Sequence, residues 1–287
     1  MRPARNPSPR IGCHVSIAGG LSRAASRAAE RGCECLQVFT TSPRAWSHQR
    51  HLPGEVAGFR AGLTAHGLSP AVVHAVYLLN LASGKSRLRA RSSAHLLETC
   101  RWARAIGAST VIFHPGHCPE GEMNGGLKRA AASLRPILRQ LPPGLTLSLE
   151  MSSGGKTAVG TAEHFSALFR LLRRHSRLRI WLDTAHAWGA GYDLRTRAGA
   201  DKLVADYSEA GGARRIAGIH ANDSLVPLGS RLDRHDNIGS GKIGLAGFRV
   251  LVRHPILRKL PFILETPGFD RQGPDRRNID RLKRLRR

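Results

Sequence analysis

Residues 179–187 have the sequence RIWLDTAHA, an apolar run that ends in an acid and is followed by a histidine. An apolar run of this length between polar flanks predicts a strand buried on both faces, as strands of parallel sheets are. Asp183 is then the last residue of the strand, and His186 follows three residues later. Functional side chains of parallel barrels gather at this carboxyl end of the strands. The segment therefore predicts both a strand and part of a site.

Five other predicted strands also end in a histidine or a glutamate. The terminal residues of all six are His74 in AVVHAVY, His114 in TVIFHPG, Glu150 in LTLSLEM, Asp183, His220 in IAGIHAND and Glu265 in PFILETPG. The chain has 20 acids and 14 histidines, 34 of 287 residues, so composition does not explain one at the same place in six strands. A ring of metal-ligating side chains at the carboxyl ends of parallel strands is what a barrel metalloenzyme requires.

Predicted strands and helices alternate along the whole chain. The strands lie near residues 11–17, 35–40, 71–77, 110–114, 145–150, 179–183, 216–222 and 262–265. Helical patterns between them cover residues 21–31, 55–66, 87–106, 127–140, 162–175, 197–210 and 245–253, and a basic terminal helix begins near residue 275. This order predicts an α/β fold, a (β/α)8 TIM barrel with a metal cluster at the C-terminal face of its strands.

No linker divides this series, so residues 11–287 are predicted to form a single domain. Residues 1–10, MRPARNPSPR, are basic and proline-rich with no apolar segment behind them, which predicts a disordered lead-in rather than a signal peptide. The polar, glycine-containing stretch 223–244 is long enough to predict a functional loop. The last twelve residues include seven Lys or Arg, which fit either a solvated helix end or an additional phosphate contact.

The charge balance indicates a polyanionic partner. Lys and Arg number 45 against 20 Asp and Glu, a formal net charge of +25. Nucleic acid is the natural partner for such a surface. A GC-rich genome would explain the preference for Arg over Lys, but not the excess of bases over acids.

Membrane and disulfide-rich classes are disfavoured. The hydrophobic content of 41% is that of a globular protein, and no apolar run is long enough to cross a bilayer. The five cysteines are odd in number and show no Cys-x-x-Cys spacing. They fit free thiols in a reducing cytoplasm better than disulfides or a zinc finger.

Nine residues are candidate metal ligands: His74, His114, Glu150, Asp183, His186, His220, Asp233, His235 and Glu265. One mononuclear zinc site needs only three protein ligands and an open position. Nine nitrogen and oxygen ligands suit two or three divalent ions such as zinc or manganese. Closely spaced metal ions are a common device for phosphate-ester hydrolysis. A single strand-end histidine is more often a hydrogen-bonded core residue than a ligand, but nine candidates together favour a metal cluster. The metal cluster and the basic surface together indicate a phosphodiesterase acting on nucleic acid.

Several blocks resemble the signatures of the endonuclease IV family of zinc-dependent apurinic/apyrimidinic (AP) endonucleases, AP endonuclease family 2. They are GCHVSIAGG, HAVYLLNLAS, FHPG, LDTAHAWGAGYDL, GSRLDRHDNIGSGKIG and FILETPG, and they span about residues 11–269. The resemblance implies a barrel that holds three zinc ions, with Mn²⁺ able to substitute at one site. It also implies cleavage of the DNA backbone 5′ to an abasic site, which leaves a 3′-hydroxyl and a 5′-deoxyribose phosphate, and cleaning of damaged 3′ ends.

In enzyme terms, the resemblance implies a deoxyribonuclease IV of the phage-T4-induced type, a phosphoric diester hydrolase of base-excision repair. Its partner would be double-stranded DNA with abasic sites or blocked 3′ ends. We expect a cytoplasmic, nucleoid-associated monomer with no membrane contact.

By the same resemblance, the nine ligands divide among three ions. His74, His114 and Glu150 hold the first; Glu150 bridges to the second, completed by Asp183, His220 and Glu265; His186, Asp233 and His235 hold the third. A bridging carboxylate keeps two cations close while offsetting their repulsion. Glu150 and Glu265 are predicted to be catalytic.

DNA recognition is predicted for other residues. An enzyme that acts on an abasic nucleotide takes it out of the base stack, and the gap must be filled. The resemblance assigns this role to Arg44 in FTTSPRAW and to Tyr77 and Leu78 in HAVYLLN. The alternatives are that Tyr77, which follows a strand, is a core aromatic and that Arg44 is one of many surface arginines.

The chain departs from the usual family pattern at Val76, Met151, Ser153, Leu225 and Ser240. None of these positions is a predicted ligand. The departures leave the predicted metal chemistry intact and bear on loop positioning and substrate range.

The principal alternative is a sugar isomerase or epimerase of related barrel fold that uses one divalent metal. Such an enzyme would need about four of the nine ligands and would have no use for the positive charge. The Asp233-x-His235 pair and Arg44 discriminate against it. A non-enzymatic DNA-binding barrel is disfavoured because all nine ligands are present.

Overall fold

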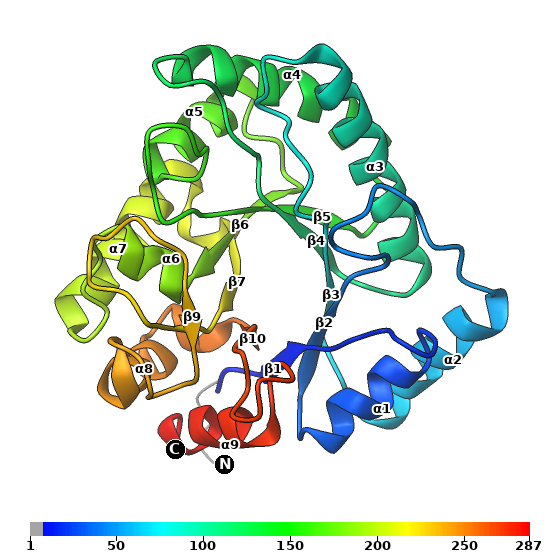
Figure 1. Cartoon of the computed structure of the whole chain (residues 1–287), viewed down its shortest axis with the longest axis vertical. Coiled ribbons are helices and arrows are strands. Elements are labelled where there is room, and N and C mark those ends of the chain that lie inside the picture. The colour runs from blue at the N-terminus through cyan, green and yellow to red at the C-terminus, as the bar shows by residue number, and fades with distance from the viewer. Residues whose placement is uncertain (1–7) are drawn as a thin grey trace, which may run out of the picture.

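The computed structural model describes residues 8–287, and it shows a ring of strands enclosed by helices (Figure 1). The barrel strands are β1 (Ile11–His14), β2 (Cys35–Val38), β3 (Ala71–His74), β4 (Thr110–Phe113), β5 (Thr146–Glu150), β6 (Leu178–Asp183), β7 (Ile216–His220) and β10 (Phe262–Leu264). All eight pair in parallel with their neighbours, and β10 closes the barrel against β1. The predicted (β/α)8 TIM barrel is confirmed.

Helices cover the outside of the barrel (Figure 1). They are α1 (Arg23–Glu30), α2 (Pro53–Ala65), α3 (Ser86–Ala105), α4 (Met123–Gln140), α5 (Ala162–Leu171), α6 (Thr184–Gly189), α7 (Arg197–Gly211), α8 (Gly244–Arg253) and α9 (Arg276–Leu285), with 3₁₀ turns η1 (Ala213–Arg215) and η2 (Leu257–Lys259). In residues 8–287, none of these helices is both long and apolar enough to cross a membrane.

Three local features differ from or add to the predicted pattern. Helix α6 follows β6 without an intervening loop, and the stretch 223–244 contains a small hairpin, β8 (Asp223–Ser224) and β9 (His235–Asp236). The terminal helix begins as predicted, because the Asp275 side chain accepts a hydrogen bond from the backbone N–H of Asn278. Residues 1–7 of the expected lead-in lie outside the described residues, whereas the Arg10 side chain donates hydrogen bonds to backbone carbonyls on two neighbouring segments.

Strand periodicity sets the depth of the site within the barrel. Side chains two positions apart on a strand point to the same face. A small apolar cluster inside the barrel consists of Cys35, Val72, Ile112, Trp181 and Ile263. The residues two positions further along each of these segments are Gln37, His74, His114, Asp183 and Glu265. The apolar cluster is therefore the floor on which a ring of polar side chains begins.

Trp181 is the largest member of this floor, and its side chain is fully buried. The ladder between β6 and β7 shifts register at this point, so that Trp181 pairs with Gly218. A Cβ atom on Gly218 would overlap the six-membered ring of Trp181. Gly218 thus leaves the space that the indole fills.

Replacing Gly218 with Ala should destabilise the fold by about 1–3 kcal/mol, because the indole would have to move within a packed core. Urea unfolding followed by circular dichroism measures this change. Gly54→Ala in α2 is the matched control, since a Cβ there meets no atom within 4 Å. Equal free energies of unfolding for the two variants would show that the Trp181 indole does not require glycine at position 218.

Candidate metal centre

All nine predicted ligands meet at the carboxyl end of the barrel strands. Three groups have ligand atoms within 4.8 Å of one another: His74, His114 and Glu150; Glu150, Asp183, His220 and Glu265; and Asp183, His186 and His235. The middle group shares Glu150 with the first and Asp183 with the third. Asp233 joins the third group through both of its histidines.

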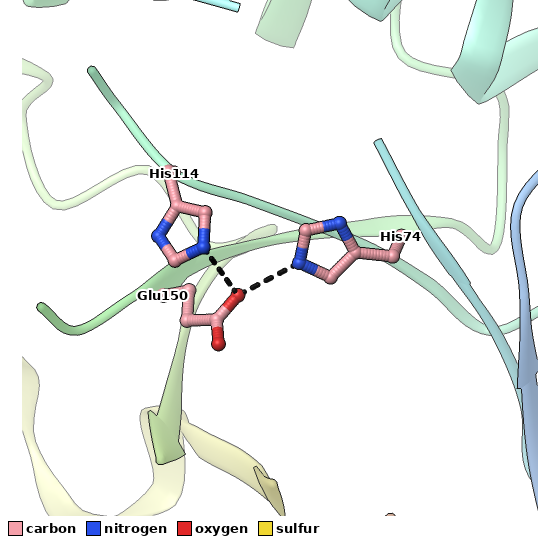
Figure 2. Close-up of side chains that lie close together, drawn as sticks. All are labelled: His74, His114 and Glu150. Carbon is pink, nitrogen blue, oxygen red and sulfur yellow. Dashed lines mark hydrogen bonds and ion pairs between the residues drawn. The ribbon is translucent and has the colours of Figure 1, made fainter. Parts of the chain in front are cut away.

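Glu150 lies between the first and middle groups. Its Oε2 atom is 2.8 Å from Nε2 of His74 and 3.4 Å from Nε2 of His114 (Figure 2). Its Oε1 atom is 2.6 Å from Nδ1 of His220. The carboxylate is buried at the end of β5, so each oxygen faces a different set of imidazoles. This is the geometry that a carboxylate shared between two cations would need.

The middle group concentrates negative charge around one imidazole. Nδ1 of His220 lies 3.6 Å from Glu265 and 3.9 Å from Asp183, in addition to its contact with Glu150. Burial lowers the pKa of His220, but the Glu150 and Glu265 carboxylates outweigh it and raise that pKa to about 9. The surroundings of this ring therefore favour a positive charge, which a divalent cation would supply while leaving the imidazole neutral.

The third group is completed from the 223–244 stretch. Asp233 places one oxygen 3.2 Å from Nε2 of His186 and the other 3.0 Å from Nε2 of His235. Burial raises the pKa of Asp233, but its hydrogen bonds to His186 and His235 outweigh that effect and lower it. Burial lowers the pKa of His235, but the hydrogen bond to Asp233 and the nearby Asp183 charge raise it to about 9. The Asp233 side chain is half exposed, so this group opens toward solvent.

Backbone carbonyls fix the orientation of two imidazoles. Nδ1 of His74 lies 2.6 Å from the carbonyl oxygen of Ala75, and Nδ1 of His186 lies 2.9 Å from that of Met151. Because a carbonyl oxygen can only accept, each Nδ1 carries the proton. Each Nε2 then faces the carboxylates of the cluster and is the atom that would ligate a metal ion there.

Gln37 fixes a third imidazole and was not among the residues predicted from the sequence. Its side-chain N–H donates to Oε1 of Glu265 at 2.6 Å, and its oxygen lies 2.8 Å from Nε2 of His220. Nε2 of His220 therefore donates, and Nδ1 faces the carboxylates. A signal was present in the sequence, since Gln37 occupies on β2 the inward position that ligands occupy on the following strands.

Asn222 and Asp223 hold the surrounding segments. The Asn222 side chain donates to Asp183 and accepts from the backbone N–H of Glu265, both at 2.8 Å.

The fully buried Asp223 carboxylate accepts from the backbone N–H groups of Gly239 at 2.8 Å and Ile243 at 2.9 Å. Asp223 thereby closes the stretch that carries Asp233 and His235 over the site.

The donor set fits divalent cations. In the described part of the chain, the four carboxylates of the cluster form ion pairs with histidines rather than with Lys or Arg. Two of these carboxylates, Glu150 and Asp183, are buried, and buried carboxylates without a cationic partner are costly. Nitrogen and oxygen ligands without thiolates are suited to ions such as zinc and manganese.

The residues predicted to contact DNA lie on loops beside this cluster. The Tyr77 side chain is 54% exposed, so it is not the core aromatic of the alternative prediction. Its ring lies 5.5 Å from that of His74. Arg44 is exposed, and Leu78 is partly buried against the core. The backbone N–H of Tyr77 donates to the carbonyl of Pro43 at 3.1 Å, which joins the two loops.

Known proteins resemble this chain over nearly its whole length. The family model described as xylose isomerase-like TIM barrel matches residues 25–286. A curated protein of Methanoculleus marisnigri named probable endonuclease 4 is 38% identical over 277 residues, which cover 96% of this chain and 98% of that protein. A similar solved structure is endonuclease IV from Thermus thermophilus, with a TM-score of 0.82, 35% identity and coverage of 96% of this chain and 98% of that one.

A solved D-tagatose 3-epimerase-like protein shares the fold at 21% identity, with a TM-score of 0.72 and coverage of 96% of this chain and 95% of that one. The family predicted from the sequence blocks is confirmed by the relatives that match at higher identity. With identities of 35% and 38% over nearly all of its length, the chain belongs to the endonuclease IV family, within the xylose isomerase-like TIM barrels.

Proposed function

We propose that this protein is a DNA-repair endonuclease that hydrolyses the phosphodiester 5′ to abasic sites in duplex DNA. The products would be a 3′-hydroxyl and a 5′-deoxyribose phosphate, and blocked 3′ ends would be further substrates. The observation that carries the proposal is the convergence of nine nitrogen and oxygen donors in three overlapping groups. The names of the endonuclease 4 relatives support the same reading.

We further propose zinc as the metal and three as its number, with Mn²⁺ able to replace zinc at one site. The first ion would be held by His74, His114 and Glu150; the second by Glu150, Asp183, His220 and Glu265; and the third by His186, Asp233 and His235. Bound divalent ions supply a nucleophilic water at neutral pH and positive charge beside the phosphate. Glu150 and Glu265, the two glutamates of the middle group, are assigned as catalytic.

DNA contact is assigned to Arg44, Tyr77 and Leu78. The two loops that carry them are joined by the Tyr77–Pro43 backbone hydrogen bond and lie beside the first ligand group. An exposed aromatic ring there can fill the space left by a displaced nucleotide. The formal charge of +25 would attract the phosphate backbone.

A single-metal sugar enzyme is the weaker reading. The likeness to the epimerase-like structure concerns the fold alone, because fold does not determine chemistry. A one-metal reaction has no role for the additional group formed by His186, Asp233 and His235. We also propose that the protein is a monomer that works in the cytoplasm at the nucleoid.

Purified protein should cut a duplex with one abasic site on its 5′ side, lose that activity on chelation and regain it on zinc addition. Gel analysis of labelled product ends measures the cleavage, and elemental analysis of the same sample counts the metals. An undamaged duplex of the same sequence is the control. No incision by the fully metal-loaded protein would refute the proposed substrate and favour a small sugar phosphate.

Asp233→Ala should lower the cleavage rate about 100-fold and remove one equivalent of bound metal, since the third group loses a carboxylate that contacts both of its histidines. Binding to the abasic duplex should persist, as fluorescence anisotropy would show. His186→Ala should behave in the same way. His66→Ala, at an exposed position beyond the end of α2, is the control. Unchanged turnover in Asp233→Ala would remove this residue from the site.

Tyr77→Ala should weaken binding to an abasic duplex about tenfold, because a stacking ring is removed. The metal content should stay constant, since Tyr77 is not a ligand. Tyr77→Phe keeps the ring and should bind as the native protein does. Loss of metal in Tyr77→Ala would instead mean that the residue supports the cluster.

A further inference from the structure

Two thiols touch each other outside the metal centre. The Sγ atoms of Cys13 and Cys33 lie 3.5 Å apart. Cys13 is on β1 with its side chain in the core between barrel and helices, and Cys33 is in the turn between α1 and β2. In residues 8–287, no other pair of cysteine sulfurs is within hydrogen-bonding distance.

The backbone holds these two sulfurs together. The N–H of Cys33 donates to the carbonyl of Ala28 at 2.9 Å, which ties it to the end of α1. The next residue, Glu34, donates its N–H to the carbonyl of Ile11 at 2.8 Å and accepts from the N–H of Ile11 at 2.9 Å. Arg286 binds the Glu34 carboxylate through two N–H groups at 2.6 and 2.7 Å. The turn is therefore fixed against β1.

The two cysteines differ in their exposure to solvent and in the cationic side chains near them. Cys13 is fully buried, whereas 8% of Cys33 is exposed. The Lys283 ammonium donates to the carbonyl of Gly32 at 2.6 Å, beside Cys33. The hydrogen bond between the two sulfurs lowers the pKa of Cys33, burial opposes this change, and Arg31 and Lys283 favour it. The hydrogen bond to Cys33 and burial raise the pKa of Cys13. Cys33, which is the more accessible sulfur and lies beside Lys283, is thus the better placed nucleophile.

We propose that Cys13 and Cys33 form a modification site at which a hydroperoxide oxidises the two thiols to a disulfide. The Cys33 thiolate attacks one peroxide oxygen of H₂O₂, the O–O bond breaks, and the departing hydroxide takes a proton to become water. The Cys13 sulfur then attacks the sulfenic sulfur of Cys33, which forms the S–S bond and breaks the S–O bond. The released hydroxide takes the Cys13 proton, so two thiols reduce one H₂O₂ to two waters.

The other cysteines lack one or more of these features. Cys35 lies inside the barrel, with its sulfur against the backbone carbonyls of Arg10 and Phe262. Cys100 is fully buried, and burial raises its pKa to about 12. Cys118 contacts the sulfur of Met123 and a backbone carbonyl. Peroxide should therefore select the Cys13–Cys33 pair, whatever reaction the metal centre carries out.

The test uses the full-length protein with a small excess of H₂O₂. The protein is then unfolded in the presence of N-ethylmaleimide, which labels free thiols, and its intact mass is measured by mass spectrometry. We expect three labelled thiols instead of the five cysteines of the chain, with the mass of two hydrogens missing. Peptide mapping should recover a link between Cys13 and Cys33, and dithiothreitol should restore five labels. Five labelled thiols after oxidation, or a link between other cysteines, would overturn the proposal.

Variants separate the two chemical roles. Cys13→Ser should stop at the sulfenic acid of Cys33, which dimedone would trap. Cys33→Ser should lose peroxide-dependent thiol oxidation about tenfold or more. Cys100→Ser, the control, should oxidise as the native protein does. Equal oxidation rates in Cys33→Ser and the native protein would refute the assignment of Cys33 as nucleophile.

Discussion

Four carboxylates and five imidazoles crowd into one end of the barrel, and their charges must balance there. Glu150 is the most constrained of these side chains, because each of its two oxygens contacts a histidine from a different part of the ring. Removing such groups from water is costly, and only opposite charge at short range compensates for that cost. Protons on His220 and His235 would offset part of the charge, and divalent cations would offset more. The surrounding framework of Gln37, Asn222 and Asp223 keeps these groups in place.

The strand ends and most of the fold could be predicted from the sequence, because strand periodicity converts a repeated pattern into a ring. His74, His114 and Asp183 each follow a buried apolar side chain by two residues. Because the apolar side chain points into the barrel, the polar side chain two residues later points inward as well. All nine predicted ligands come together in the structure, although His186 and His235 lie outside the barrel strands. The residues predicted these two histidines as ligands, but their assignment to one common group rested on the resemblance, since α6 and the hairpin of β8 and β9 leave no periodic pattern.

Contacts between distant segments could not be predicted in the same way. Gln37 forms hydrogen bonds with both His220 and Glu265. Its inward position on β2 could be predicted from the strand pattern, but the side chains that it contacts could not. Asp223 accepts from backbone groups whose positions depend on the glycine-rich turn at residues 239–244. Tyr77 follows a strand, where an aromatic ring fits either the core or the surface, and only the folded loop shows that it is exposed.

The indole of Trp181 and the four other side chains of the inner cluster fill the barrel beneath the ring of ligands. The barrel is therefore closed at this depth and open at the carboxyl ends of its strands. The proposed metal ions and the phosphate of the proposed substrate would therefore enter from the open end, which is also where the exposed loops lie. A DNA duplex bound across that end would block the exchange of ions with solvent. Metal ions bound beforehand would then be retained until the product leaves, so metal exchange would be confined to the interval between one substrate and the next.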